Sequence, residues 1–384
     1  MFRSILPFLI IFPPLVYGII SILCARAFFG RRRYPSGHTP PVTILKPVKG
    51  IDADSFENFA SFCRQDYPSY QIIFAAASSS DPVIPVIERL QAEFPAAGIE
   101  LVVDGRIYGP NYKVCNLINA FSRARHDILI VCDSDIRVGE QYLREVCAPF
   151  SDPAVGLVTS LYRTSKPEGL ATAIEAMGFT AELVPNVMVA LRLEGLSFAL
   201  GASMAVRREA LAKIGGFESL VDYLADDYQL GNKVCRAGYR LELSDYLLES
   251  VIHRESLSTV LSRQLRWART MRASRPGGYL ASGITQPFPM ALMALIVSGF
   301  SACGVAAALL LYLVRCGIAL TFSRRYLKDG IFPCRLWLLP LRDLLAFATW
   351  ALSFLGSRVR WRGHVYRLLA NGRIEEEVSA RAGQ

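Results

Sequence analysis

Long apolar runs stand at both ends of the chain. The first, residues 6–29, contains no acidic side chain and one basic one, Arg26, and three arginines follow it at residues 31–33. A removed secretory leader has a shorter apolar core and a small-residue cleavage site, whereas a run of this length spans a bilayer. We therefore predict a retained transmembrane anchor over residues 1–33.

Two further apolar runs lie near the end of the chain, each followed by a basic segment. Residues 287–322 contain one charged side chain, and residues 336–356 contain only the adjacent Arg342 and Asp343. If both basic segments are cytoplasmic, the first run crosses the membrane twice with a turn near Gly304, and the second is re-entrant or interfacial. The alternative is three full spans with the tail outside. Arg342 and Asp343 favour the first interpretation, because an ion pair deep in lipid is costly.

Between these membrane segments, short β-branched runs alternate with helical patterns. The predicted strands are residues 42–45, 71–77, 99–103, 128–132 and 155–159. This alternation is typical of an α/β domain with a mainly parallel sheet and helices on both faces. We place this domain at residues 42–276, after a linker at residues 34–41. Residues 277–357 form the C-terminal membrane region, and residues 358–384 form the tail.

Composition narrows the class of protein. The chain has a net charge of +9, but its basic residues flank apolar segments, which favours anionic lipid headgroups over nucleic acid as the counter-charge. Nine scattered cysteines without a Cys-x-x-Cys motif indicate a reducing compartment. With the arginines after the anchor, this predicts a cytoplasmic catalytic domain on an integral membrane protein, at the inner membrane if the chain is bacterial.

Several common site types have no sequence support. The chain lacks the glycine fingerprints of dinucleotide-binding and P-loop proteins. Its four histidines are dispersed, so a histidine metal site is not expected, and no Ser-His-Asp arrangement is readable. A nucleotide would have to be held by carboxylates, a metal and basic side chains instead.

Two aspartates, Asp133 and Asp135, directly follow the predicted strand 128–132. Ligands of open α/β sheets bind outside the carboxyl ends of strands, and a divalent cation held by one or two carboxylates keeps room for phosphate oxygens. We predict that these aspartates hold Mg²⁺ or Mn²⁺ together with the diphosphate of a sugar nucleotide. The alternative is a pair of solvated loop or helix-capping residues.

Two more candidate residues stand at predicted helix starts. Lys113 lies in the first turn of a helix after Gly109, where a lysine and backbone amides suit a phosphate or a uracil carbonyl. Asp227 begins the helical stretch 226–237, where a carboxylate can deprotonate an acceptor hydroxyl. A solvated lysine and a helix-capping aspartate are the respective alternatives.

A basic and aromatic motif follows on the predicted helix 256–272. Arg263, Arg266 and Trp267 share one face of that helix. Arginines there can form charge-assisted bonds to a departing diphosphate, and the tryptophan can stack on a ring or seal the pocket. The alternative is an amphipathic helix at the membrane interface.

Together these motifs resemble the ceramide glucosyltransferase family, glycosyltransferase family 21, which comprises membrane-bound inverting enzymes with a GT-A fold. The motifs that carry the resemblance are Leu45-Lys46-Pro47-Val48-Lys49-Gly50, Gln65-Asp66-Tyr67-Pro68, Asp133-Ser134-Asp135-Ile136-Arg137-Val138, Ala225-Asp226-Asp227-Tyr228, Arg263-x-x-Arg266-Trp267 and Trp361-Arg362-Gly363-His364-Val365-Tyr366. The resemblance implies a metal and diphosphate at Asp133 and Asp135, a general base at Asp227, and a nucleotide gripped by Arg263, Arg266 and Trp267.

One position departs from the family pattern. Ser78 stands where the family usually has an aspartate that contacts the uridine. Either Asp81 takes this role from a turn away, or the serine bonds the base itself.

The resemblance predicts transfer of a hexose from a UDP-sugar to the primary hydroxyl of a membrane lipid, UDP-glucose to ceramide in the first instance. Residues 225–230 and 265–270 are also similar to a bacterial hopanoid-associated branch, so UDP-N-acetylglucosamine and a hopanoid polyol are the alternative substrates. A processive polysaccharide synthase normally needs more membrane spans and typically has glutamine at position 263. A non-catalytic binding protein with degenerate sites is disfavoured by the presence of all three aspartates.

Overall fold

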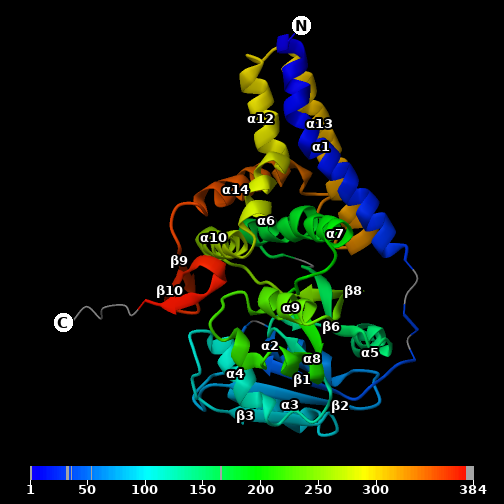
Figure 1. The fold of residues 1–384 in the computed structure, drawn as a ribbon, viewed down its shortest axis with the longest axis vertical. Coiled ribbons are helices and arrows are strands. Elements are labelled where there is room, and N and C mark those ends of the chain that lie inside the picture. Colours follow the sequence, from blue (N-terminus) through cyan, green and yellow to red (C-terminus); the bar gives the residue numbers. More distant parts are fainter. Residues whose placement is uncertain (1, 32–33, 36, 53, 165–166, 378–384) are drawn as a thin grey trace, which may run out of the picture.

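The computed structural model describes residues 2–31, 34–35, 37–52, 54–164 and 167–377. An α/β domain forms one end of the molecule and a bundle of long helices forms the other, with a layer of helices between them (Figure 1). The N-terminal end of the chain lies at the tip of the bundle (Figure 1).

The α/β domain is built on an eight-stranded sheet with the order β3-β2-β1-β4-β7-β6-β8-β5. The strands are β1 (Val42–Pro47), β2 (Tyr70–Ala76), β3 (Ile99–Val103), β4 (Ile128–Cys132), β5 (Ile136–Arg137), β6 (Val155–Arg163), β7 (Ser203–Arg207) and β8 (Arg240–Ser250). Parallel pairs join β1 to β2 and β4, β2 to β3, and β6 to β8, whereas β7 is antiparallel to β4 and β6, and β5 to β8. The expected α/β fold is confirmed, as a mixed sheet.

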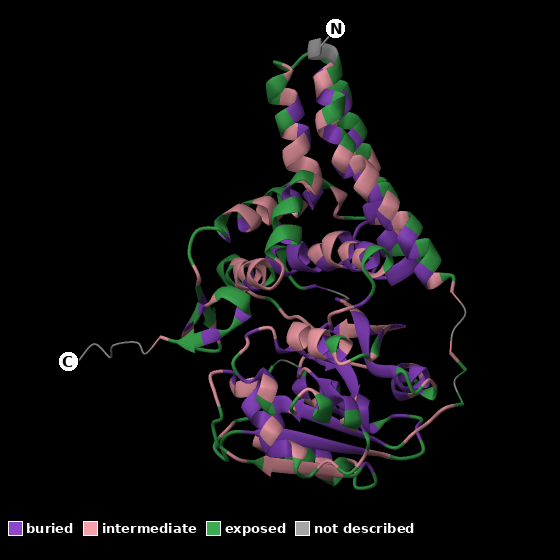
Figure 2. Cartoon of the chain, viewed as in Figure 1, coloured by how far each residue is buried: buried purple, intermediate pink, exposed green. Residues whose placement is uncertain are grey.

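The sheet is covered on both faces, which explains why its central strands read as unbroken apolar runs. Leu129 and Val131 of β4 belong to one buried cluster, and Ile130 belongs to the other. The first face carries α4 (Tyr112–Phe121), α8 (Arg208–Lys213) and α9 (Asp226–Arg236); the second carries α2 (Ser55–Cys63), α3 (Ile84–Glu93) and α5 (Tyr142–Cys147). Figure 2 shows the central strands mostly buried, whereas the edge strand β3 has no buried residue.

The helices of the bundle and of the middle layer include the predicted membrane segments. They are α1 (Phe2–Phe29), α6 (Leu170–Gly178), α7 (Val184–Leu193), α10 (Leu257–Ser274), α11 (Pro276–Ala281), α12 (Pro287–Val297), α13 (Ala302–Thr321) and α14 (Leu339–Leu352). Within the described part of the chain, three stretches are long and apolar enough to cross a membrane: Ile5–Phe29, Leu170–Leu193 and Ala302–Leu327. A bent pair, Pro276–Thr285 and Pro287–Val297, would add a fourth if it forms one span.

These stretches differ in their surroundings. Leu170–Leu193 is mostly buried inside the protein, and α6 and α7 form the middle layer between the α/β domain and the bundle (Figure 1). By contrast, α1 and α13 run side by side with α12 in the projecting bundle, where many of their side chains are exposed (Figure 2). The chain reverses between α12 and α13, shortly before Gly304.

The charged pair of the last apolar run is enclosed by protein. Asp343 on α14 accepts hydrogen bonds from Arg315 at 2.9 and 3.0 Å and from Arg342 at 3.0 Å, and Arg342 also bonds to Glu182. All three members of the Asp343 group are buried. This agrees with the argument that such a pair faces protein and not lipid.

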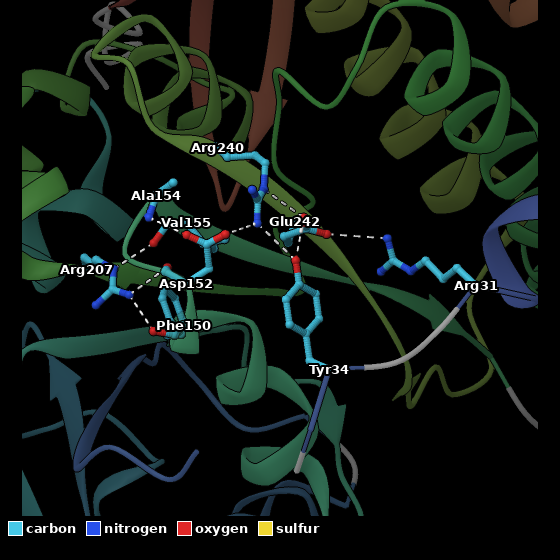
Figure 3. Close-up of polar contacts among 9 residues, drawn as sticks. All are labelled: Arg31, Tyr34, Phe150, Asp152, Ala154, Val155, Arg207, Arg240 and Glu242. Atoms are coloured by element: carbon cyan, nitrogen blue, oxygen red, sulfur yellow. Dashed lines mark hydrogen bonds and ion pairs between the residues drawn. The ribbon is translucent and has the colours of Figure 1, made fainter. Parts of the chain in front are cut away.

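The end of the anchor is fastened to the α/β domain by polar contacts (Figure 3). Glu242 on β8 pairs with Arg31 at 3.4 Å and accepts a hydrogen bond from the Tyr34 hydroxyl at 2.9 Å. Arg240 of the same strand donates to Tyr34 at 3.1 Å and pairs with Asp152 at 2.8 Å. These bonds fix the position of the α/β domain relative to the end of α1.

The last three strands form a small antiparallel sheet. Its strands are β9 (Arg358–Trp361), β10 (His364–Leu368) and β11 (Ile374–Glu376), in the order β11-β10-β9. We call it the C-terminal sheet. Its core of Val359, Tyr366, Leu368 and Ile374 packs with Leu224, just before α9.

Candidate active site

The first acidic motif lies where β4 ends, as the sequence predicts. The Asp133 amide donates to the Ala202 carbonyl at 3.3 Å, and the buried Lys46 ammonium donates to the Asp133 carbonyl at 3.0 Å. Asp135 accepts a hydrogen bond from the Ser250 hydroxyl at 3.2 Å. The two aspartates are thus held in place by the strands on either side, with the Asp133 carboxylate half-exposed.

Lys113 brings the two acidic motifs together. It stands in the first turn of α4, which Asn111 caps by accepting the Val114 amide at 3.1 Å. Its ammonium lies 2.8 Å from Asp133 Oδ1 and 3.4 Å from Asp226 Oδ2. Burial lowers its pKa, but the carboxylates outweigh burial and leave the pKa above its usual range. A solvated first-turn lysine does not fit this geometry.

Asp227 lies next to Asp226 and Lys113, in the first turn of α9. The N-cap residue of the helix is Ala225, so Asp227 does not cap it. Its Oδ1 accepts a hydrogen bond from the adjacent Tyr228 amide, at 2.7 Å. Burial and the Asp226 carboxylate raise the pKa of Asp227 to about 6, against the opposing charge of Lys113. We refer to Asp133, Asp135, Asp226 and Asp227 as the acidic cluster.

The two arginines of α10 have different surroundings. Arg263 is paired with two carboxylates: its Nε donates to Glu175 at 2.7 Å, and its Nη1 donates to Glu255 at 3.1 Å. Arg266 forms no ion pair in the described part of the chain. Its guanidinium lies 6.0 Å from the centre of the Trp267 ring and 5.8 Å from that of Trp361 on β9.

The uridine-contacting candidates lie at the ends of β2 and its following turn. Both oxygens of Asp81 accept the Gly50 amide, at 3.0 and 3.1 Å, and Oδ1 also accepts the Val83 amide at 3.0 Å. Ser78 bonds to Ser80, with 2.8 Å between the hydroxyl oxygens. Asp81 therefore holds the loop after β1, and within the described residues neither Asp81 nor Ser78 bonds to a member of the acidic cluster.

A sequence model of glycosyl transferase family 21 matches residues 6–374. The chain belongs to this family. It is a glycosyltransferase, and the resemblance noted in the sequence is confirmed.

Relatives and one solved structure agree. The chain is 26% identical to ceramide glucosyltransferase 3 of Caenorhabditis elegans over 379 residues, which cover 97% of this chain and 82% of the relative. It is 36% identical to the ceramide glucosyltransferase of Komagataella phaffii over 136 residues, or 32% of this chain and 25% of the relative. A mannosyltransferase from Pyrobaculum calidifontis, solved with GDP-Man and Mn²⁺, has 16% identity and a TM-score of 0.55, and the match covers 92% of this chain and 98% of that one. This last likeness supports the GT-A fold.

The donor set of this family 21 member suits a divalent cation. No group of three or more His, Cys, Asp or Glu side chains arranged for a metal occurs within the described residues. Two carboxylates on one short turn are nevertheless the usual protein share of an Mg²⁺ or Mn²⁺ site that takes its other ligands from water and phosphate. Burial, with the adjacent Asp133 charge, raises the pKa of Asp135 to about 6, and a bound cation would relieve that repulsion. The residues therefore fit the ion.

Some supporting residues of the site were not assigned from the sequence. Lys46 lies in one of the motifs that carry the family resemblance, but the sequence analysis gives it no role in the site. A lysine inside an apolar strand is the sequence feature that indicates such a role. Tyr162, at the end of β6, had no signal. Its ring lies 4.9 Å from Phe179, which lies 6.0 Å from Trp267, so three aromatic rings connect β6 to α10. Burial and the charges of Asp227 and Asp135 raise the pKa of Tyr162.

Proposed function

We propose that this family 21 glycosyltransferase moves a hexose from a UDP-sugar to the primary hydroxyl of a membrane lipid, with ceramide as the acceptor and UDP-glucose as the donor. The observation that carries the proposal is the convergence of Lys113, Asp133 and Asp226 beside the half-buried Asp227. The names of the relatives supply glucose and ceramide.

The proposed reaction is a single displacement at the anomeric carbon. Asp227 accepts the proton of the lipid hydroxyl while the oxygen of that hydroxyl attacks, and an α-linked donor gives a β-glycoside. Lys113 and Arg266 stabilise the negative charge that develops on the departing diphosphate. A divalent cation held by Asp133 and Asp135 would neutralise the same leaving group. Catalysis then rests on positioning and on electrostatic stabilisation.

The proposed setting is the cytoplasmic face of a membrane. The helices α1, α12 and α13 project from one side of the molecule, and the middle layer of α6, α7, α10 and α14 lies between them and the sheet (Figure 1). A domain held in this way has its acidic cluster close to the headgroup region, where a lipid hydroxyl is available. The arginines at residues 31–33, just after α1, support the cytoplasmic side by the distribution of basic residues.

The test is a lipid-product assay on the full chain in detergent. The protein is incubated with Mn²⁺ or Mg²⁺, with UDP-glucose, UDP-galactose or UDP-N-acetylglucosamine, and with a mixture of ceramide and a hopanoid polyol; products are identified by mass spectrometry, and a parallel sample contains EDTA. Hexosyl-ceramide that disappears with EDTA supports the proposal. An N-acetylhexosaminyl hopanoid would keep the chemistry and replace both substrates. Long polymer would favour a processive synthase, and no product with any donor would refute lipid glycosylation.

A further inference from the structure

The C-terminal sheet contacts α4, the segment before α9, and α10, although it lies more than 80 residues beyond α10 in sequence. At α4, the Tyr112 hydroxyl donates to Glu376 at 2.8 Å, and His364 Nδ1 lies 2.6 Å from the other oxygen of that carboxylate. Tyr112 is the residue before Lys113. The sheet is thus bonded to the helix turn that holds the site lysine.

The same sheet is joined to the chain that leads into α9. The Ile374 amide donates to the Asp222 carbonyl at 2.8 Å, and the Leu224 amide donates to the Gly372 carbonyl at 3.4 Å. These bonds lie three to five residues before Asp227. The C-terminal sheet therefore has a fixed position relative to the acidic cluster.

The turn between β9 and β10 reaches the loop after β1. Arg362, at the tip of this turn, donates from Nη1 to the Lys49 carbonyl at 3.0 Å. The preceding residue, Trp361, presents its ring to Arg266 of α10. The turn thus connects the end of β1, next to β4 and its Asp133, to the unpaired arginine of α10.

Two guanidinium groups lie close together here. Burial and the charges of Arg263 and Arg362 lower the pKa of Arg266 to about 10, although the charges of Asp227 and Asp133 act in the opposite direction. No ion pair to Arg266 or Arg362 is present in the described part of the chain. A guanidinium has five N–H donors, and the Lys49 carbonyl takes one of those of Arg362. Like charges held together in this way are stabilised by an anion, and the bidentate geometry of arginine suits phosphate oxygens.

The surrounding surface has the same sign. A pocket of about 420 Å³ lies between α10 and the C-terminal sheet, and its lining includes Arg266, Arg269, Arg358 and Arg360, with Glu377 as the carboxylate among its lining residues. Clustered cationic side chains raise the local concentration of anionic ligands. An anionic ligand is therefore favoured next to Arg266.

We propose that Arg362 is a further donor-binding residue, which bonds to the diphosphate of the sugar nucleotide together with Arg266. The proposal rests on the proposed function in that it requires a nucleoside diphosphate donor. It makes the C-terminal sheet a part of the donor site, in addition to the segments that carry Lys113, Asp133 and Arg266. The competing explanation is that Arg362 only fastens the turn to the Lys49 carbonyl.

The test measures nucleotide affinity on the purified full chain in detergent with Mn²⁺. UDP and GDP are titrated by calorimetry, and uridine and guanosine are measured by competition against them. Arg362→Ala is expected to weaken the bound nucleoside diphosphate about tenfold and to leave the affinity for the corresponding nucleoside unchanged. Arg367→Ala, which removes an exposed arginine from β10 of the same sheet, is the matched control and should change neither affinity.

The outcomes separate the two proposals. Unchanged diphosphate affinity in Arg362→Ala, or equal weakening of diphosphate and nucleoside, would overturn the role of Arg362 and leave the proposed function standing. Equal weakening would identify a structural role. If the wild-type chain bound neither UDP nor GDP, the proposed function would fall first, and this inference with it. A thermal melt of each variant confirms that the fold is retained.

Discussion

The two sides of the active site carry opposite charge, and they differ in how far neighbouring side chains neutralise that charge. The acidic cluster has a cation built in: Lys113 contacts Asp133 and Asp226. The opposite side, which we call the basic wall, consists of Arg266 and Arg362 and has no carboxylate bonded to either arginine in the described part of the chain. The acidic side is thus partly neutralised before any substrate binds, whereas the basic side is not.

This difference suggests a division of labour. A partly neutralised acidic cluster keeps a carboxylate, Asp227, with a pKa near the working pH, which suits proton transfer. An unpaired basic wall retains its full attraction for a diphosphate. Mutation of Asp227 should therefore change turnover more than donor binding, and mutations on the basic wall should do the reverse.

The largest expected effect comes from removing the proposed base. Asp227→Asn preserves the shape of the side chain but cannot accept the acceptor proton, so we expect kcat to fall about a thousandfold with little change in UDP affinity. Steady-state transfer and UDP calorimetry measure the two quantities. Asp222→Asn, an exposed aspartate five residues earlier, is the control. Parallel loss of UDP affinity and transfer would indicate that Asp227 has a structural role.

A second prediction contrasts the two arginines of α10. Arg263→Ala leaves Glu175, with a side chain only 1% exposed, and Glu255 without their partner, so we expect a loss of about 3 kcal/mol in stability and a lower melting temperature. Arg266→Ala breaks no ion pair and should leave the melting temperature nearly unchanged, while weakening UDP at least tenfold. Differential scanning fluorimetry and calorimetry separate the two. Equal melting temperatures would show that the Arg263 pairs are not structural.

The contrast between these arginines shows what sequence can and cannot establish. Their spacing on one helix face is a local property, and α10 begins and ends close to the predicted helix. Glu175, the buried partner of Arg263, lies 88 residues earlier in the chain. No local pattern reveals that pairing, so both arginines were predicted to bind the nucleotide, and only the structure distinguishes them.

The sheet shows the same limit. Strands buried on both faces, such as β1 and β4, have unbroken apolar sequences and were predicted within two residues of their observed ends. By contrast, β7 is short and β8 (Arg240–Ser250) interleaves charged with apolar residues, and neither was predicted. Their pairing places Ala202 against Asp133 and Ser250 against Asp135, so the support of the metal-binding candidates depends on contacts that are distant in sequence.

A third prediction uses the raised pKa of Asp227. Protonation below about pH 6 removes the proposed base, so kcat/KM should fall about tenfold between pH 7 and pH 5 at saturating Mn²⁺. The direction follows from burial and the Asp226 charge, which outweigh Lys113 and favour the protonated form. The profile is measured with buffers of constant ionic strength. A flat profile from pH 7 to pH 5 would contradict the assignment of Asp227 as the base, because a protonated Asp227 cannot accept the proton of the lipid hydroxyl.

The smallest effect tests the position of the base and not its identity. A Cβ added at Gly201 would lie 2.9 Å from Asp227 Oδ2 and 3.4 Å from its carboxyl carbon, closer than real contacts allow. The carboxylate is a side-chain terminus and moves by a few tenths of an ångström, so Gly201→Ala should fold normally and lower kcat about fivefold without changing UDP affinity. Gly278→Ala, whose added Cβ has nothing within 4 Å, is the matched control. Since Asp227 lies on α9, whereas the basic wall lies on α10 and the C-terminal sheet, a displaced base should leave donor binding intact. A fall in UDP affinity in Gly201→Ala would show that the two sides are coupled.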